Sequence, residues 1–212
     1  MQHSDDKLHP VAISQVMLNF AQRHGIDQQT CLLGTGIAEA ELSSGEGLVT
    51  RTQEMRLIEN LMLALPSVGV GGFELGLQYN LATFGVWGFA LRTCKTLRDA
   101  VTLGIRYLPL STAYCRISVC EEGDTFGVIF DPDPIPPHLR QFLLERDMAT
   151  AINLVREITL QGVAFQGIEF TGEPDVAGSV VSSLCGLTPT FHARANRLLV
   201  NRAGASQPFP RL

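Results

Sequence analysis

Glycines and large apolar residues are mixed from Gly71 to Leu110, and this stretch limits the possible folds more than any other part of the chain. Three helical patterns run through it, and the last one, from Leu97 to Leu108, follows Thr96 as a candidate N-cap. A glycine inside a helix costs about 1 kcal/mol relative to alanine. Because glycines in an apolar helix usually mark a close approach of two backbones, the sequence predicts tightly packed helices here.

The rest of the chain has helical patterns before this stretch, and alternating strand and helix patterns after it. Helices are expected over residues 11–23, 52–65, 137–160 and 175–185, and strands over residues 113–120, 125–130, 163–170, 189–195 and 197–200. This order predicts the α+β class, with a helical N-terminal half packed with a small mixed or antiparallel sheet in a single domain. Residues 1–8 are expected to be disordered, and the tail from residue 201 has the composition of a linker.

The composition favours a folded protein that does not bind nucleic acid by itself. Apolar residues make up 45% and charged residues 17% of the 212 residues, which is enough for a core without disulfides or structural metal. A net charge of -5 is opposite in sign to what the phosphates of DNA attract. No apolar run reaches the roughly 18 residues of a membrane span, so we expect no membrane contact. The five cysteines include no C-x-x-C pair, which favours reduced thiols and a cytoplasmic protein.

Sequence patterns that indicate catalysis are weak in this chain. The histidines are isolated from one another, so we expect no metal and no cofactor. No G-x-S-x-G sequence presents a serine nucleophile, and the glycines near residues 69–72 lack the lysine of a phosphate-binding loop. Glu145 and Asp147 share one predicted helix but point in different directions, so they form no catalytic dyad. A Cys-His pair that meets only in space stays open.

A group of aromatic side chains with arginines among them favours a ligand pocket instead. The candidate binding residues are Tyr79, Phe84, Trp87, Tyr107, Tyr114, Arg116 and Glu145. We expect the cavity between residues 79–87, the helix end at Tyr107 and the start of the first strand. Arg116 would bind an anionic group of the ligand, whereas an amine would need a carboxylate such as Glu145 or Asp147. An aromatic core with surface arginines is the alternative interpretation.

Several blocks of the sequence resemble one family of bacterial regulators. The blocks are GLQYNLATFGVWGFAL, TLRDAVTLGIRYLPL, FDPDPIPPHLRQFLLERDMATAINLVRE and FHARANRLLV. In their order and spacing they are similar to the N-terminal effector domain of AraC/XylS-type transcription regulators, in the subgroup with an arabinose-binding-like sensor. The resemblance extends from about His9 to about Val200.

The resemblance implies a regulatory domain rather than an enzyme. Residues 9–200 would bind an effector and form a homodimer, and residues 201–212 would begin the linker to a helix-turn-helix domain that is absent from this chain. The effector would be a small molecule, such as an amino acid or another small metabolite, and DNA would be bound only through the absent domain. Two alternatives stay open: a dimerisation module without a small ligand, and a small enzyme with an unrecognised site.

Overall fold

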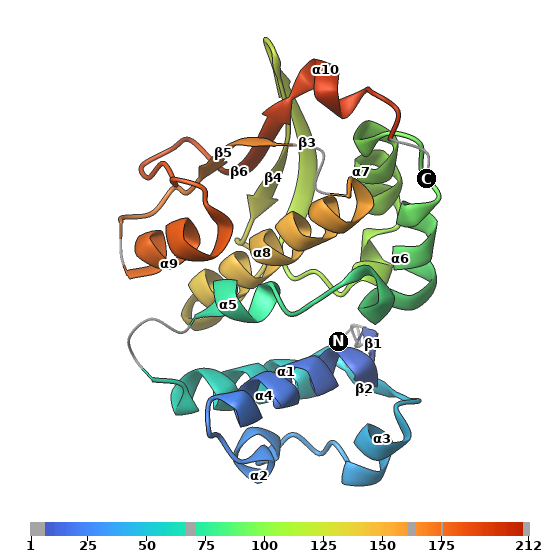
Figure 1. Cartoon of the computed structure of the whole chain (residues 1–212). Helices are drawn as coiled ribbons and strands as arrows, with labels where there is room; N and C mark the ends of the chain where they lie inside the picture. The colour runs from blue at the N-terminus through green and yellow to red at the C-terminus, as the bar shows by residue number, and fades with distance from the viewer. Residues whose placement is uncertain (1–6, 67–70, 161–163, 175, 210–212) are drawn as a thin grey trace, which may run out of the picture. The chain divides into compact units, whose positions relative to one another are not determined.

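The structure is a computed structural model that describes residues 7–66, 71–160, 164–174 and 176–209. The chain forms two compact units, Met1–Ser67 and Val68–Leu212 (Figure 1). Both units contain helices and strands, and the α+β class expected from the sequence is confirmed. That residues 9–200 form the effector-binding domain stays a prediction.

The first unit consists of short helices and one small pair of strands. Its elements are β1 Leu8–Pro10, α1 Val11–Arg23, α2 Gln28–Leu32, α3 Glu39–Ser44, β2 Leu48–Thr50 and α4 Arg51–Ala64. Strands β1 and β2 are antiparallel, with Leu8 opposite Thr50. Of the residues expected to be disordered, Met1 to Asp6 lie outside the described ranges, whereas Leu8 is paired in this sheet.

Helix α4 begins at a complete capping box. The hydroxyl of Thr50 accepts the N–H of Gln53 at 3.1 Å, and the Gln53 side chain accepts the N–H of Thr50 at 2.9 Å. These two bonds satisfy donors that the first turn of a helix cannot pair by itself. The helix therefore starts at Arg51, one residue before the position expected from the apolar pattern.

The second unit contains a sheet and the helices that cover it. Its helical elements are α5 Gly72–Gly76, η1 Leu81–Phe84, α6 Gly85–Arg92, α7 Leu97–Arg106, η2 Leu108–Ser111, η3 Pro137–Leu139, α8 Arg140–Ile158, α9 Val176–Cys185 and α10 Arg202–Ala205. Its strands are β3 Arg116–Glu122, β4 Thr125–Asp131, β5 Phe165–Glu169 and β6 Asn196–Asn201. They form one sheet in the order β3-β4-β6-β5 with antiparallel pairing throughout, so the sheet is antiparallel rather than mixed.

Helix α8 is the longest helix of this unit and is buried along most of its length (Figure 1). Helix α5 lies beside it, and the contact is between backbones: a Cβ atom on Gly76 would come 2.3 Å from the carbonyl oxygen of Arg146. Only glycine fits at such a distance. The close packing predicted for the glycine-rich stretch is therefore confirmed at this pair of helices.

The first strand begins later than its alternating pattern predicts. The expected start was residue 113, but β3 begins at Arg116. The backbone N–H groups of Tyr114 and Cys115 each donate to Oδ2 of Asp147 at 2.8 Å, so they are not available to a strand ladder. The strand expected over residues 189–195 is also absent from the described structure, where β6 begins at Asn196.

The tail of the described chain is packed on the second unit. Residues 202–205 form α10, where Ala205 is fully buried in a cluster with Leu97, Phe126 and Val200. The N–H of Phe209 donates to the carbonyl of Lys95 at 2.8 Å.

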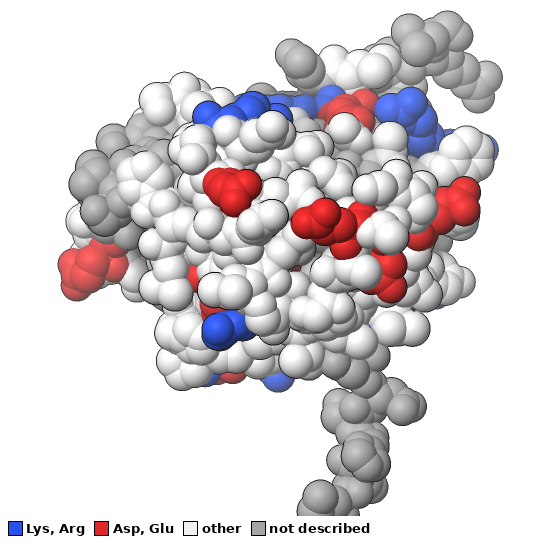
Figure 2. All heavy atoms as spheres, turned by 90° about the horizontal axis from the view of Figure 1, so that it is seen from below, with Lys and Arg blue, Asp and Glu red and all other residues white. Residues whose placement is uncertain are grey.

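Charged side chains of both signs lie on the surface. On the face drawn in Figure 2, acidic groups are scattered, and basic groups lie along the upper edge and at a few places in the lower half. The described residues on this face therefore present no continuous basic surface of the kind that neutralises DNA phosphates. Within the described ranges, no helix combines the length and apolar character that a bilayer crossing needs.

Candidate functional site

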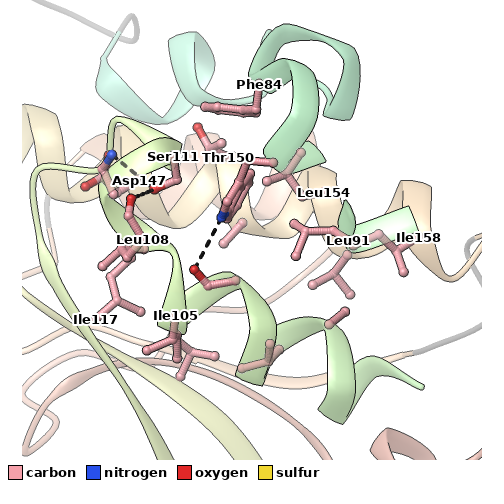
Figure 3. A pocket seen from close by; sticks show the side chains of 18 of the residues that line it. Phe84, Leu91, Ile105, Leu108, Ser111, Ile117, Asp147, Thr150, Leu154 and Ile158 are labelled. Carbon is pink, nitrogen blue, oxygen red and sulfur yellow. Dashed lines mark hydrogen bonds between the residues drawn. The ribbon is translucent and has the colours of Figure 1, made fainter. Parts of the chain in front are cut away.

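An apolar cavity of about 110 Å³ lies inside the second unit, between the sheet and three helices (Figure 3). Helices α6, α7 and α8, the 3-10 turns η1 and η2, and strands β3 and β4 supply most of its lining. The lining includes the aromatic rings of Phe84, Trp87 and Phe130 and aliphatic side chains such as Leu91, Ile105 and Leu154. A concave apolar space with a few polar groups at its border is the usual form of a small-molecule site.

Helix α8 contributes a stripe along one side of this cavity. Asp147, Thr150, Leu154 and Ile158 lie at the three- and four-residue spacing that places side chains on one helix face. In Figure 3, Asp147 lies at one side of the cavity together with Ser111, and Ile158 lies at the opposite side. The cavity therefore has a polar end and an apolar end.

Hydroxyl and indole groups at the lining mostly bond to the backbone. Ser111 Oγ donates to the carbonyl of Leu108 at 2.7 Å, and Thr150 Oγ1 donates to the carbonyl of Arg146 at 2.8 Å. The indole N–H of Trp87 donates to the carbonyl of Gly104 at 3.3 Å. These contacts use the donors of the wall within the protein, which leaves a surface that is largely apolar toward the cavity.

Arg146 and Asp147 form the charged border of the cavity. Arg146 is 1% exposed, and its Nε lies 3.5 Å from Oδ1 of Asp147. Its Nη2 donates to the carbonyl of Thr112 at 3.2 Å, and its guanidinium carbon lies 5.1 Å and 5.2 Å from the ring centroids of Tyr79 and Tyr114. Ion pairing and aromatic faces together stabilise a guanidinium that has lost its water.

The structure places some of the residues expected to bind ligand at the cavity and others away from it. Phe84 and Trp87 line the cavity, and their ring centroids are 5.4 Å apart. Tyr79 and Tyr114 are buried beside Arg146, outside the lining. The structure thus brings four of the expected aromatic residues into or next to this site.

The three other candidates lie away from the cavity wall. Tyr107 is 49% exposed at the end of α7. The Arg116 side chain is 70% exposed and pairs with Asp131 at 3.0 Å. Glu145 is buried, but its Oε1 accepts from Gln141 and its side chain is not among those that line the cavity. Their roles in binding stay predictions that this geometry does not favour.

The site predicted from the sequence includes Arg116 and not Arg146. Alternation would place Arg116 on one strand face with Tyr114, but Tyr114 lies before the strand begins. Arg146 is the arginine at the cavity. The pattern that indicates it is a pair of opposite charges, Arg146 and Asp147, inside an otherwise strongly apolar helix.

The thiol of Cys115, which lies beside Asp147, is not activated. Burial raises the pKa of Cys115 far above its ordinary value, and the nearby carboxylate of Asp147 adds to this effect. A thiol that stays protonated is a poor nucleophile. Among the described residues, no group of three or more His, Cys, Asp and Glu side chains could hold a metal ion.

Residues 25–209 match the arabinose-binding domain that forms the N-terminal part of AraC transcription regulators. The chain belongs to this family. Its domain is thus a regulatory ligand-binding domain, of a family that contains transcription regulators rather than enzymes.

Relatives of this AraC-family chain are longer proteins. It is 30% identical over 206 residues to the HTH-type transcriptional regulators Rv1395 of Mycobacterium tuberculosis and Mb1430 of Mycobacterium bovis. The alignment covers 95% of this chain, and the chain spans about 60% of the length of each relative. Among solved structures, the transcriptional regulator CdpR of Pseudomonas aeruginosa has a TM-score of 0.64 at 17% identity, covering 98% of this chain and 58% of that one. This structural likeness supports the fold.

Proposed function

We propose that this AraC-family domain senses a small-molecule effector in the cavity of its second unit, and that occupancy of the cavity controls DNA binding by a helix-turn-helix domain of the same regulator. The cavity itself is the observation that carries the proposal. It is bordered by elements from three parts of the chain: α6 and α7, the hairpin of β3 and β4, and α8.

The position of α8 supports a route from ligand to conformational change. Helix α8 borders the cavity and is also in backbone contact with α5 at Gly76. Because that contact leaves no space for adjustment, a displacement of α8 would move α5 with it. A ligand shifts such an equilibrium only by its difference in affinity for the two arrangements.

The DNA-binding part of the proposal rests on the family. The relatives that the chain matches are HTH-type regulators, and the chain corresponds to about 60% of their length. With a net charge of -5, the 212-residue chain should not shift a promoter fragment at physiological salt. Nanomolar binding of DNA by this chain at 200 mM salt, measured by fluorescence anisotropy, would contradict this part.

We also propose that the domain forms homodimers. Val86 and Phe89 lie three residues apart on α6, so they are on one face of the helix, and they are 82% and 70% exposed. Neighbouring large apolar side chains at such exposure are typical of contact surfaces. Sedimentation velocity should show a dimer that dissociates when both residues are changed to Ser, and a monomer at all concentrations would refute this part.

Ligand binding can be measured through Trp87, which is the only tryptophan of the chain and lines the cavity. A library of small metabolites, amino acids included, is titrated into the chain while the emission of Trp87 is recorded. We expect at least one compound to give a saturable change in this emission, because a ligand in the cavity changes the environment of the indole.

A matched pair of variants shows whether the change comes from the cavity. Ala151→Met places a longer side chain into the cavity, since Ala151 belongs to its lining. Ala203→Met makes the same change on the exposed surface of α10. The first variant should lose binding and the second should keep it. If a bound compound is held equally well by both variants, the cavity is not the effector site.

A further inference from the structure

We propose that the ligand of this cavity is a small uncharged molecule that consists mainly of hydrocarbon, with an aromatic or a branched aliphatic body. The inference rests on the proposed function and specifies the chemical class of the effector. It follows from three observations: the wall is almost entirely apolar, its polar groups are used within the protein, and the cavity is small.

Hydrocarbon side chains supply almost the whole surface of the cavity. The rings of Phe84, Trp87 and Phe130 contribute to it, and in Figure 3 the aliphatic side chains of Leu91 and Ile158 lie at the end opposite Asp147. Such a surface attracts a ligand by dispersion and by the removal of apolar area from water, and neither effect requires a polar group on the ligand. The wall therefore favours a ligand whose own surface is apolar.

The hydroxyl groups of the wall already have partners. Ser111 Oγ donates to the carbonyl of Leu108 at 2.7 Å, and Thr150 Oγ1 donates to the carbonyl of Arg146 at 2.8 Å. A pentose carries a hydroxyl on most of its carbons, and each hydroxyl needs a hydrogen-bond partner when it leaves water. The wall therefore does not suit a sugar, although the domain family is described as arabinose-binding.

The two charged residues of the described lining, Arg146 and Asp147, face protein groups. Their side chains are 1% and 2% exposed, and Oδ2 of Asp147 accepts the backbone N–H groups of Tyr114 and Cys115 at 2.8 Å. Because the two charges are opposite and lie 3.5 Å apart, their fields largely cancel in the cavity. A cationic or anionic ligand would lose its water without gaining an accessible partner, a cost that an uncharged ligand does not carry.

The size of the cavity limits the ligand to a short molecule. A cavity of about 150 Å³ lined by Leu, Ile and Phe is known to hold benzene. This cavity, at about 110 Å³, is of that order. We therefore expect a ligand with roughly six to ten non-hydrogen atoms, such as a single ring with a short alkyl group.

The first test compares ligands of similar size that differ in charge. Ethylbenzene is paired with benzylamine, a cation at neutral pH, and acetophenone is paired with benzoate, an anion; L-arabinose is included. Each compound is titrated into the 212-residue chain by calorimetry, up to its solubility. We expect ethylbenzene and acetophenone to bind saturably, each roughly tenfold or more tightly than its charged counterpart, and we expect L-arabinose to give no heat of binding.

A series of alkylbenzenes tests whether the hydrocarbon body fills a cavity of limited size. Each methylene that moves from water into an apolar site should improve the affinity roughly fourfold. We expect this gain from benzene to toluene to ethylbenzene, and a loss of affinity in hexylbenzene, whose chain exceeds the cavity. A steady gain through hexylbenzene would indicate adsorption to exposed apolar surface and would overturn the proposal.

Two leucine variants connect the size limit to this cavity. Leu154→Ala enlarges the cavity, because Leu154 is 6% exposed and belongs to its lining, whereas Leu63→Ala makes the same change in a side chain of α4 that is 86% exposed. The first variant should bind hexylbenzene roughly tenfold or more tightly than the unmodified chain does, and the second should not. An equal affinity in the two folded variants would place the hydrocarbon outside this cavity.

Near-ultraviolet circular dichroism establishes whether each variant is folded. If Leu154→Ala does not fold, the comparison of charged with uncharged ligands in the unmodified chain decides by itself.

The outcomes separate this inference from the proposed function. If benzylamine, benzoate or L-arabinose binds as tightly as the uncharged compounds, or if no hydrocarbon binds, the ligand class is wrong. The cavity remains the effector site as long as some compound of the metabolite library is bound by the unmodified chain and lost in Ala151→Met. If no compound binds in the cavity, the proposed function itself fails.

Discussion

A Cβ atom on Gly72 would lie 1.8 Å from the carbonyl oxygen of Phe142. The two residues belong to α5 and α8, and the distance is far shorter than any contact that a side chain can make. The backbones of the two helices are therefore in direct contact, and the position of α5 depends on the absence of a side chain at this glycine.

Gly72→Ala should destabilise the protein by about 3 kcal/mol or more, because the obstacle is a helix backbone rather than a side chain that can rotate. Gly172→Ala is the matched control, since a Cβ at Gly172 would meet nothing within 4 Å. The control should change the free energy of unfolding by less than about 0.5 kcal/mol. Urea denaturation followed by circular dichroism measures both values, and similar values for the two variants would contradict the packing described here.

Asp147→Asn should destabilise the fold by about 3–5 kcal/mol, because it removes a buried negative charge that lies 3.5 Å from the buried guanidinium of Arg146. Asp131→Asn breaks the pair with Arg116, whose side chains are 32% and 70% exposed, and should cost less than about 1 kcal/mol. Urea denaturation at low salt measures both changes in the free energy of unfolding. A cost for Asp147→Asn no larger than that for Asp131→Asn would show that the pair with Arg146 is not a significant charge interaction.

Thr50→Ala should cost about 1 kcal/mol, since the Thr50 hydroxyl accepts the N–H of Gln53 at the start of α4. Asp27→Ala serves as its control. Asp27 occupies the N-cap of α2 but makes no capping bond with its side chain, so this change should cost less than about 0.5 kcal/mol. Thermal and urea unfolding of both variants test the difference, and equal losses would argue against the capping box.

The free energy of unfolding should fall as the pH rises above about 8.5, the ordinary pKa of a thiol. Burial raises the pKa of Cys31, Cys115 and Cys185 in the folded chain, so above this pH the unfolded chain binds fewer thiol protons than the folded chain. Alkali therefore favours unfolding, by up to about 1.4 kcal/mol per pH unit for each such thiol. Cys115→Ala should reduce the slope, as measured by urea denaturation from pH 7 to pH 10. An unchanged slope in this variant would exclude Cys115 as a source of the effect.

Helix bounds that are set by a local sequence signal, such as an N-cap or a glycine, were predictable from the sequence. Helix α1 has the bounds that its apolar stripe and the following glycine indicate, Val11–Arg23. Thr96 caps α7 by accepting the N–H of Asp99 at 3.0 Å, as its place before the third apolar pattern suggested. The end of α7 differs from the prediction: the helix ends at Arg106, and the 3-10 turn with Pro109 follows, because proline has no N–H to continue the ladder.

The candidate site was predictable only in part. Phe84 and Trp87 line the cavity, and their apolar, aromatic character within the glycine-rich stretch indicated them. Ile117, Thr150 and Leu154 were missed, because in the sequence they are ordinary members of a strand and a helix. Which residues line a cavity depends on which surfaces of different elements face one another, whereas sequence periodicity describes one element at a time.

The sequence by itself determined the periodic helices, their caps, the hairpin and the family to which the chain belongs. Tertiary structure alone decided which arginine is buried. The carboxylate of Asp147 takes the N–H groups of Tyr114 and Cys115, which precede it by 33 and 32 residues, and thereby delays the strand to Arg116. Arg116 then lies in solvent while Arg146 is held inside by the same aspartate. A contact between residues so far apart in the chain leaves no local pattern, because its energy depends on the fold that brings them together.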